Sequence, residues 1–242
     1  MHEIVWTGEK INALWDFYSR DPERRSQYFS LNFGRDIIRY VKQYIDFSNI
    51  RSVLDFGCGP GYLMKYLFDS CRSKIYGLDF FRESIEQVKK EFSDRSQFAG
   101  AVCVGSLPSE FKSGSMDLVF SIEVIEHLSD RQLEETLQEI HRLLMPGGMV
   151  VITTPNRENL EASKTMCPEC GCVFHRWQHI RTWDDLILKH LIEKSGFCTI
   201  VCRPVEAYKP RTYRRLLKAV YRLFSRSSSV SSPFLIYIGK KT

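Results

Sequence analysis

Three closely spaced glycines follow an apolar segment in the stretch RSVLDFGCGPGY, at residues 51–62. The apolar segment, 52–56, predicts a buried strand, and the Gly/Pro cluster predicts a tight turn. A helix is expected to begin near Tyr62. Glycine allows sharp turns and lets a backbone approach a ligand closely. A strand, a glycine-rich loop and a helix in this order predict an α/β fold that binds a nucleotide at the carboxyl edge of its sheet.

Strands and helices are expected to alternate after this loop. Strands are expected at 74–80, 101–105, 116–122, 148–154, 198–204 and 233–241, and helices at 82–92, 130–144 and 182–195. Residues 145–148 (Met-Pro-Gly-Gly) are expected to end a helix and form a turn. The alternation predicts βαβ units and a doubly wound, mostly parallel sheet. A short final connection would make the last strand antiparallel.

Asp79 ends the second of these strands, 22 residues after Gly57. A carboxylate at this place can accept hydrogen bonds from both hydroxyls of a ribose. The glycine loop and the acid together therefore predict a nucleoside-binding site, rather than a turn that merely happens to be rich in glycine.

A chain of 242 residues suits a single domain, 1–242. Helices at 9–19 and 34–46 would form an N-terminal lid, and two insertions interrupt the regular pattern. The lid spans residues 1–48, the Cys/His-rich insertion 155–180 and the basic amphipathic insertion 207–232. The chain has no apolar run of about 18 residues and no apolar signal core near its start, so a cytoplasmic protein is expected.

The glycine spacing differs from the dehydrogenase pattern G-x-G-x-x-G, because the third glycine comes one residue early. Three further segments follow one family pattern: MDLVFSIEVIEHL (116–128), LLMPGGMVVITTPN (143–156) and TWDDLILKHLIEKSGF (182–197). With the glycine loop they resemble the class I S-adenosylmethionine (SAM)-dependent methyltransferases, over about residues 50–205 and the last strand. The resemblance implies a seven-stranded sheet with an antiparallel last strand.

The same resemblance implies where SAM is bound. Asp79 would hold the ribose, and the adenine would lie near Phe80 and the turn 105–107. Ser106 stands where many members of the family carry an acid. The residues implied in SAM binding are Asp55, Gly57, Cys58, Gly59, Gly61, Asp79, Phe80, Gly105, Ser106, Leu107 and Ser121.

The motif Glu123-x-x-Glu126-His127 follows the fourth strand, at the edge of the sheet where a substrate would bind. Two carboxylates and an imidazole suit Mg²⁺, Mn²⁺ or Zn²⁺. The motif resembles that of ubiquinone-pathway O-methyltransferases and of small-RNA 2′-O-methyltransferases, in which it is associated with a divalent ion. The second family adds a histidine four residues before a tryptophan, a spacing that His179 and Trp183 match. The alternatives are a divalent ion at these residues, His127 as a metal-free base, and structural packing.

Three cysteines and a histidine lie within nine residues: Cys167, Cys170, Cys172 and His175. Tetrahedral Zn²⁺ accepts such a Cys₃His set. A structural zinc ion is the favoured interpretation, because its binding energy of about 10–16 kcal/mol could fold an irregular loop. Free thiols and a redox pair are the alternatives.

Seven basic side chains and no acidic one lie within 209–226, whereas the rest of the chain has 27 basic and 29 acidic residues. Residues 213–226 would form a helix with one apolar and one basic face. The alternatives are peripheral contact with the inner membrane face or a lipid-linked acceptor, packing on the domain itself, and contact with a polyanion. Nucleic acid is the weakest of these, because its binders usually carry more basic surface.

These observations predict O-methylation of a hydroxyl on a small-molecule, glycan or lipid-linked acceptor. Glu123, Glu126, His127 and His179 are the candidate catalytic residues. Methylation of RNA 2′-hydroxyls is the alternative within the same fold. A non-catalytic SAM-binding or zinc-stabilised interaction module is the alternative of another class.

Overall fold

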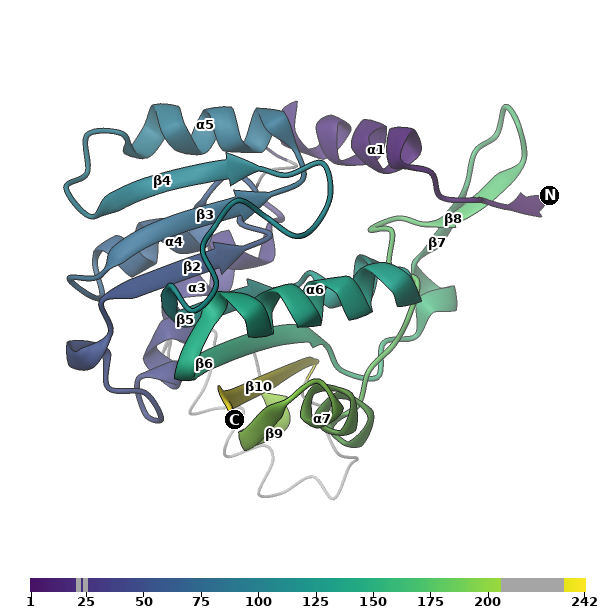
Figure 1. Cartoon of the computed structure of the whole chain (residues 1–242). Helices are drawn as coiled ribbons and strands as arrows, with labels where there is room; N and C mark the ends of the chain where they lie inside the picture. The colour runs from purple at the N-terminus through teal and green to yellow at the C-terminus, as the bar shows by residue number, and fades with distance from the viewer. Residues whose placement is uncertain (21–22, 24–25, 206–232) are drawn as a thin grey trace, which may run out of the picture.

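The computed structural model describes residues 1–20, 23, 26–205 and 233–242. A twisted central sheet has helices on both faces, and a smaller sheet extends from one side of it (Figure 1). The basic segment 213–226 lies outside the described residues. Among the described residues, each helix is too short or too polar to cross a lipid bilayer.

The central sheet has seven strands in the order β4-β3-β2-β5-β6-β10-β9. Their bounds are Ser52–Phe56 (β2), Lys74–Asp79 (β3), Phe98–Cys103 (β4), Met116–Ile122 (β5), Leu144–Pro155 (β6), Phe197–Val205 (β9) and Phe234–Lys241 (β10). Strand β10 is antiparallel to both of its neighbours, and the pairs from β4 to β6 are parallel. The predicted fold class and the antiparallel last strand are confirmed.

Helices cover the two faces of this sheet. Helices α3 (Phe29–Val41), α4 (Tyr62–Phe68) and α5 (Arg82–Phe92) pack on one face, and α6 (Asp130–Leu143) and α7 (Asp185–Lys194) on the other. Successive strand residues point to opposite faces, so Val53 joins the first core and Leu54 the second. A strand buried on both faces reads as a continuous apolar run, which is why these strands could be located from the sequence.

The chain changes direction between β2 and β5. From β2 it proceeds outward through β3 to β4, and from β5 it proceeds the other way to β6. Such a topological switch point opens a crevice at the carboxyl ends of the two central strands. The glycine loop follows β2 and the Glu123 motif follows β5, so both lie at this crevice.

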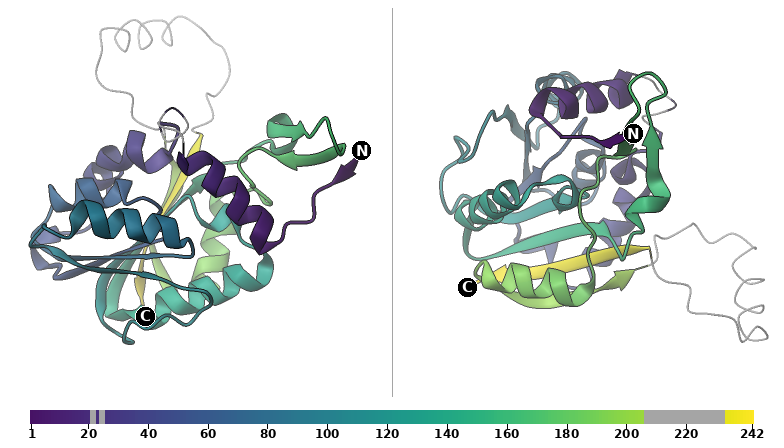
Figure 2. Two further views of the ribbon diagram at one scale, coloured as in Figure 1. Left: turned by 90° about the horizontal axis from the view of Figure 1, so that it is seen from above. Right: turned by 90° about the vertical axis from the view of Figure 1, so that its right-hand side faces the viewer.

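A second, three-stranded sheet is formed by β1 (His2–Glu3), β8 (Cys172–His175) and β7 (Lys164–Met166). Strands β7 and β8 form an antiparallel hairpin, and β1 pairs in parallel with β8. Helix α1 (Gly8–Arg20) follows β1, and Figure 2 shows the N-terminal segment beside the hairpin. The sequence did not predict this sheet, because strands of two to four residues are too short to show a period.

Several boundaries differ from the sequence prediction. Strand β4 begins at Phe98 and ends at Cys103, and its pairing with β3 shifts register between Phe98 and Gly100, whose φ is 124°. Residues 145–148 were expected to form a turn before a strand at 148–154, but β6 begins at Leu144, and these residues lie within it as a register shift against β5. Short 3₁₀ helices occur at Phe47–Asn49, Ile125–His127 and Leu160–Ser163.

Candidate active site

The glycine loop after β2 is built from left-handed backbone conformations. Gly57, Gly59 and Gly61 have φ values of 75°, 48° and 83°. A Cβ at Gly57 would lie 2.6 Å from Cγ2 of Val124, so the loop packs directly against the chain that leaves β5. The amide of Gly57 donates to the carbonyl of Leu78 over 2.8 Å, which fixes the loop beside β3. Glycine is therefore required here by both conformation and space.

Asp79 connects this loop to the end of β3. Its Oδ2 accepts a hydrogen bond from the amide of Gly59 over 2.8 Å, and its Oδ1 accepts one from the amide of Phe81 over 2.8 Å. Burial raises the pKa of Asp79 to about 6, although these backbone bonds act in the opposite direction. Each carboxylate oxygen can accept a second bond, so the ribose hydroxyls implied by the resemblance remain compatible with this arrangement.

Asp55 lies at the end of β2 and is buried. Its Oδ2 has no hydrogen-bond partner. Burial, followed by the negative charge of Asp79, raises the pKa of Asp55 to about 8. A buried carboxylate without a partner is costly, and a cationic ligand would relieve that cost.

The other residues implied in SAM binding differ from one another in exposure and in the element that carries them. Phe80 is 40% exposed, just beyond β3, and residues 105–107 follow β4. Ser121 is fully buried in β5, and its Oγ has no hydrogen-bond partner. The side chain of Cys58 instead belongs to the apolar core beside Gly77, where burial raises the pKa of its thiol. The backbone of Cys58 is also engaged, since its amide donates to Leu78 over 3.0 Å and its carbonyl accepts from the amide of Gly61 over 2.9 Å, so the structure gives Cys58 a role in shaping the loop.

The Glu123 motif begins with a strained residue. Glu123 has a φ of 54°, and its amide donates to the carbonyl of Thr153 on β6 over 3.0 Å. Its Oε1 accepts a hydrogen bond from Oγ1 of Thr153 over 2.9 Å. Burial raises the pKa of Glu123 to about 8, with the Thr153 bond acting against it. A left-handed conformation at a residue other than glycine is typical of a site in which geometry is fixed at the cost of strain.

Glu126 is fully buried on the short helix after β5. Its Oε2 accepts a hydrogen bond from Oγ1 of Thr154 over 3.0 Å, and its Oε1 has no hydrogen-bond partner. Burial raises the pKa of Glu126 well above its usual value, and the charge of Glu123 adds to this effect. His127 Nε2 lies 3.8 Å from the unpartnered Oε1.

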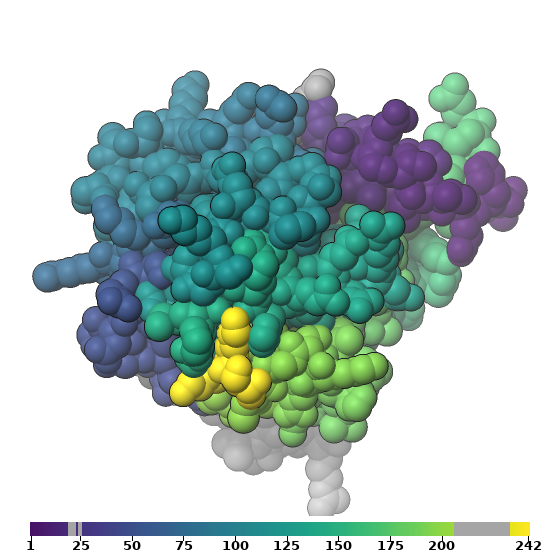
Figure 3. All heavy atoms as spheres, viewed as in Figure 1, coloured from purple at the N-terminus to yellow at the C-terminus, as the bar shows by residue number. Residues whose placement is uncertain are grey.

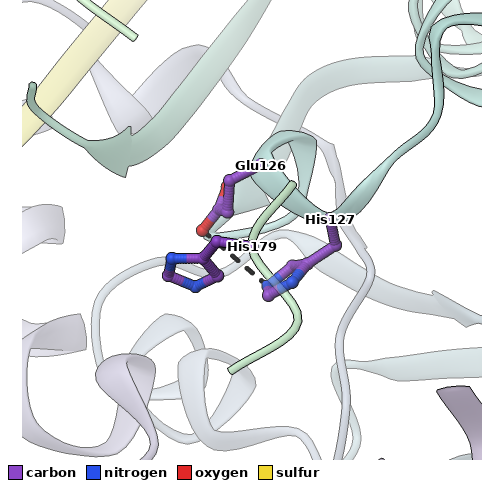
Figure 4. A group of neighbouring side chains, drawn as sticks. All are labelled: Glu126, His127 and His179. Carbon is purple, nitrogen blue, oxygen red and sulfur yellow. Dashed lines mark ion pairs between the residues drawn. The ribbon is translucent and has the colours of Figure 1, made fainter. Parts of the chain in front are cut away.

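His179 comes from the chain after β8 and meets this pair. Its ring centroid lies 4.8 Å from that of His127, and Figure 4 shows Glu126, His127 and His179 converging from two separate segments. Each of the three offers a ligand atom within 4.8 Å of the others. Glu123 is not a member of this group. The structure thus brings together three of the four residues predicted as catalytic.

The imidazole of His127 is buried between Gln178 and Trp15. Its Nδ1 lies 3.4 Å from the carbonyl oxygen of Gln178, and its ring is met edge-on by Trp15 at a centroid distance of 5.2 Å. Burial, and after it the charge of His179, lowers the pKa of His127 to about 3. The imidazole is therefore neutral at physiological pH.

Glu158 belongs to the site, although no sequence motif pointed to it. It follows β6 in an irregular segment, and its Oε2 hydrogen-bonds Nδ1 of His179. Its Oε1 lies 3.4 Å from Nε2 of His175. Burial acts to raise the pKa of Glu158, but the hydrogen bond from His179 and the nearby imidazoles outweigh it and hold the pKa below its usual value.

Helix α1 covers this cluster from outside. Nε1 of Trp15 donates to Oε1 of Gln178 over 3.4 Å, and Nε2 of Gln178 donates to the carbonyl of His127 over 2.9 Å. Tyr18 stacks on Trp177 at a centroid distance of 4.6 Å. Figure 3 shows the N-terminal segment (purple) beside the hairpin of the Cys/His-rich insertion (green). The sequence could not predict the contacts of α1, since they join residues about 160 positions apart.

The predicted Cys₃His set is not assembled as one group. Among the described residues, the sulfur atoms of Cys167, Cys170 and Cys172 and a nitrogen of His175 do not all come within 4.8 Å of one another. His175 lies beside Glu158 and His179 instead, with its ring stacked on His179 at 4.6 Å. The reason is the strand β8: residues three apart in a strand point to opposite faces, so His175 points away from Cys172.

Comparison with known proteins agrees with the family that the sequence motifs resemble. A family model described as a methyltransferase domain matches residues 15–201. A Mycolicibacterium smegmatis protein described as a probable S-adenosylmethionine-dependent methyltransferase is 34% identical over 147 residues, which cover 61% of this chain and 52% of the relative. A rice protein described as a probable chloroplastic tocopherol O-methyltransferase is 29% identical over 179 residues, covering 67% and 45%. The chain thus matches about half the length of these two relatives.

A solved structure extends this likeness to the whole described fold. The complex between the Haloferax volcanii Trm112 methyltransferase activator and a methyltransferase contains a chain that superposes with a TM-score of 0.66 and 18% identity. The superposition covers 98% of this chain and 99% of that one. At this identity the likeness shows a shared fold.

Proposed function

We propose a specific reaction from the premise that the chain belongs to the methyltransferase-domain family. In this reaction the protein transfers the methyl group of SAM to a hydroxyl oxygen of a small-molecule acceptor. The donor would occupy the crevice at the carboxyl ends of β2 and β5. The name of the rice relative, an O-methyltransferase of a small molecule, supports the choice of atom and acceptor.

The crevice fits SAM in two respects. The left-handed loop at Gly57 and Gly59 lets the backbone approach a ligand closely, and Asp79 lies at the end of β3 with acceptor capacity for a ribose. The unpartnered Oδ2 of Asp55 is a buried acceptor at the donor crevice, and a cationic donor bound beside it would favour the ionised form of this carboxyl. Holding donor and acceptor in line can supply about 7–11 kcal/mol of the barrier reduction for such a displacement.

One observation carries the choice of a hydroxyl acceptor: buried Glu126 meets His127 and His179 beside the donor crevice. A hydroxyl must lose its proton to become a good nucleophile. A histidine with a pKa of about 3 is a weak general base near neutral pH, because the best catalytic pKa lies close to the working pH. The low pKa of His127 therefore favours its role as a neutral ligand over that of a metal-free base.

The residues fit a divalent cation. Glu126 has a fully buried carboxylate oxygen with no partner, and the imidazoles of His127 and His179 lie beside it. Such a mixed nitrogen and oxygen set suits Zn²⁺ or Mn²⁺. When bound, the ion would lower the pKa of the acceptor hydroxyl. Glu123, held by Thr153, lies beside this set, and a bound cation would favour the ionised form of its carboxyl.

The cysteine turn is proposed as a separate structural zinc site. The amide of Cys167 donates to the carbonyl of Cys172, and the amide of Gly171 donates back to the carbonyl of Cys167, each over 2.9 Å. Hydrogen bonds from the backbone of Cys170 and Glu169 lower the pKa of the Cys167 thiol. A lowered pKa favours the thiolate, which is the form that binds zinc. Cys167 and Cys170 would supply two thiolates to the ion, and Cys172, whose sulfur the structure does not group with both of theirs, would join them on zinc binding.

The test is methyl transfer from labelled SAM into three pools: hydroxylated small molecules, total RNA, and a membrane lipid extract. We expect label in the small-molecule pool, loss of transfer after treatment with a chelator, and recovery on addition of Mn²⁺. Label in RNA would replace the small-molecule acceptor with a 2′-hydroxyl. SAM binding without transfer to any pool would favour the non-catalytic module, and transfer unaffected by chelator would refute the cation.

A further inference from the structure

We propose that Glu158 is a positioning residue of this site, which fixes His179 in the tautomer that carries its proton on Nδ1 and leaves Nε2 as an acceptor. The consequence for cation binding rests on the proposed function. The tautomer itself follows from contacts that can be tested without a cation or a substrate.

The first step concerns His179. Its Nδ1 hydrogen-bonds Oε2 of Glu158, and an ionised carboxylate can only accept. The proton of this contact must therefore come from His179. In the neutral form of His179 this is the one N–H of the ring, so Nε2 keeps its lone pair.

The second step concerns His175, which occupies the other side of the same carboxylate. Its Nδ1 accepts hydrogen bonds from the amide of Trp177 over 3.3 Å and from the amide of His179 over 3.1 Å. Because Nδ1 is used as an acceptor, the single proton of neutral His175 lies on Nε2. That nitrogen is 3.4 Å from Oε1 of Glu158, and the residue is 4% exposed.

His179 belongs to two groups of potential metal ligands, and the tautomers show which of the two groups has lone pairs available for an ion. Glu158, His175 and His179 also lie close enough to hold an ion. His175 has no lone pair left for one, because Nδ1 accepts two backbone amides and Nε2 carries the proton. The group Glu126, His127 and His179 is therefore the one that binds, and Glu158 with His175 supports it from behind.

His127 shows the same arrangement from its own side. Its Nδ1 lies 3.4 Å from the carbonyl oxygen of Gln178, which can only accept, so Nδ1 is the donor and the neutral ring keeps its lone pair on Nε2. A metal-binding histidine usually donates its other N–H to a carboxylate or a carbonyl, which fixes the tautomer and the ring orientation. Here His179 has the carboxylate of Glu158 and His127 has the carbonyl of Gln178.

The experiment measures tautomers directly by long-range ¹H–¹⁵N correlation spectra of the full chain labelled on histidine, with signals assigned from single His→Gln variants. We expect the Nδ1–H form for His179 and the Nε2–H form for His175 in the wild type. Glu158→Gln keeps one acceptor oxygen, so it should weaken the Nδ1–H preference of His179, and Glu158→Leu should abolish it. Glu161→Gln, an exposed acid three residues away, is the matched control and should change neither histidine.

An Nε2–H form of His179 in the wild type would overturn the proposal, and this result needs no variant to fold. An unchanged His179 tautomer in a folded Glu158→Leu protein would also overturn it. The second readout is Mn²⁺ affinity, which should fall about 10- to 100-fold in Glu158→Gln. Equal affinity of Glu158→Gln and wild type would count against the positioning role. If the wild type shows the expected tautomers but does not bind Mn²⁺, the positioning role of Glu158 is supported and only the cation of the proposed function is refuted.

Discussion

Oε1 of Glu126 lies 3.8 Å from Nε2 of His127, and this carboxylate oxygen is fully buried without a hydrogen-bond partner. Two residues adjacent in the sequence thus present a costly buried acceptor and a neutral imidazole to the same point. Burying an unpaired acceptor costs about 1–3 kcal/mol, more for a charged group. A fold tolerates this cost where a ligand or a reaction uses the group, so Glu126 is the first residue to test.

Glu126→Gln should reduce methyl transfer about 10²- to 10⁴-fold, because the amide keeps the shape of the side chain but cannot become the anionic ligand of the cation that helps to deprotonate the acceptor hydroxyl. The amide oxygen can still accept the hydrogen bond from Thr154, so thermal stability should change little. The measurement is turnover with saturating SAM, with Glu135→Gln on the exposed face of α6 as the control. Wild-type turnover in Glu126→Gln would remove Glu126 from the reaction.

Asp79→Asn should weaken binding of S-adenosylhomocysteine roughly 5- to 150-fold, the range expected when a hydrogen bond costing about 1–3 kcal/mol is lost. The amide group would place a donor opposite the amide of Gly59 or of Phe81, each of which now donates to the carboxylate. Calorimetric titration gives the affinity. Asp69→Asn, at an exposed helix end, is the control, and equal affinities of the two variants would contradict a role of Asp79 in the donor site.

Gly57→Ala should destabilise the fold and impair donor binding. The new Cβ would meet Cγ2 of Val124 at 2.6 Å, and alanine pays about 1–2 kcal/mol for the left-handed conformation. The double variant Gly57→Ala/Val124→Ala relieves the clash but not the conformational cost. Denaturant unfolding should therefore show partial recovery in the double variant. Full recovery would mean that backbone conformation at Gly57 contributes nothing.

The sequence was sufficient for the parts of this site that depend on local pattern. Strands β2 and β5 are mainly apolar because both of their faces are buried, and the glycine loop and the Glu123 motif follow them directly. Contacts between segments that are distant in the sequence have no local sequence pattern from which they could be predicted. Glu158 lies in an irregular segment, and its role depends on where β8 delivers His175 and His179.

The Cys/His-rich insertion shows how a correct spacing can mislead. Four ligand residues in nine positions suggested one tetrahedral site, which would require all four to point to one place. The pairing of β8 with β7 and β1 imposes alternation, so His175 faces the active site while Cys172 faces away. The spacing of the four residues alone does not show that Cys172 and His175 point in opposite directions, because that depends on their lying in strand β8.

The ligand-free protein should lose stability as pH rises, in part because of Asp55. Its pKa is raised to about 8 in the folded state by burial and by Asp79, so the folded protein binds this proton more tightly than the unfolded chain. The stabilisation is therefore fully present below the unfolded pKa of about 4 and is lost as pH approaches 8. Asp55→Asn should lower the slope of unfolding free energy against pH by up to about 1.4 kcal/mol per unit in this window. An unchanged slope, measured against Asp69→Asn, would show that Asp55 titrates normally.

The cysteine turn should hold one zinc ion per chain, bound independently of the active-site histidines. Cys170→Ser should remove this zinc, because Cys170 and Cys167 are held together by the turn. His175→Gln should retain it, because His175 lies beside Glu158 rather than beside the cysteines. Cys198→Ser, at an exposed thiol on β9, is the matched control. The measurement is the zinc content per chain, by elemental analysis of protein purified without chelator. Loss of zinc in His175→Gln would show that His175 completes a Cys₃His site. The absence of zinc from the wild type would show that these cysteines are free thiols.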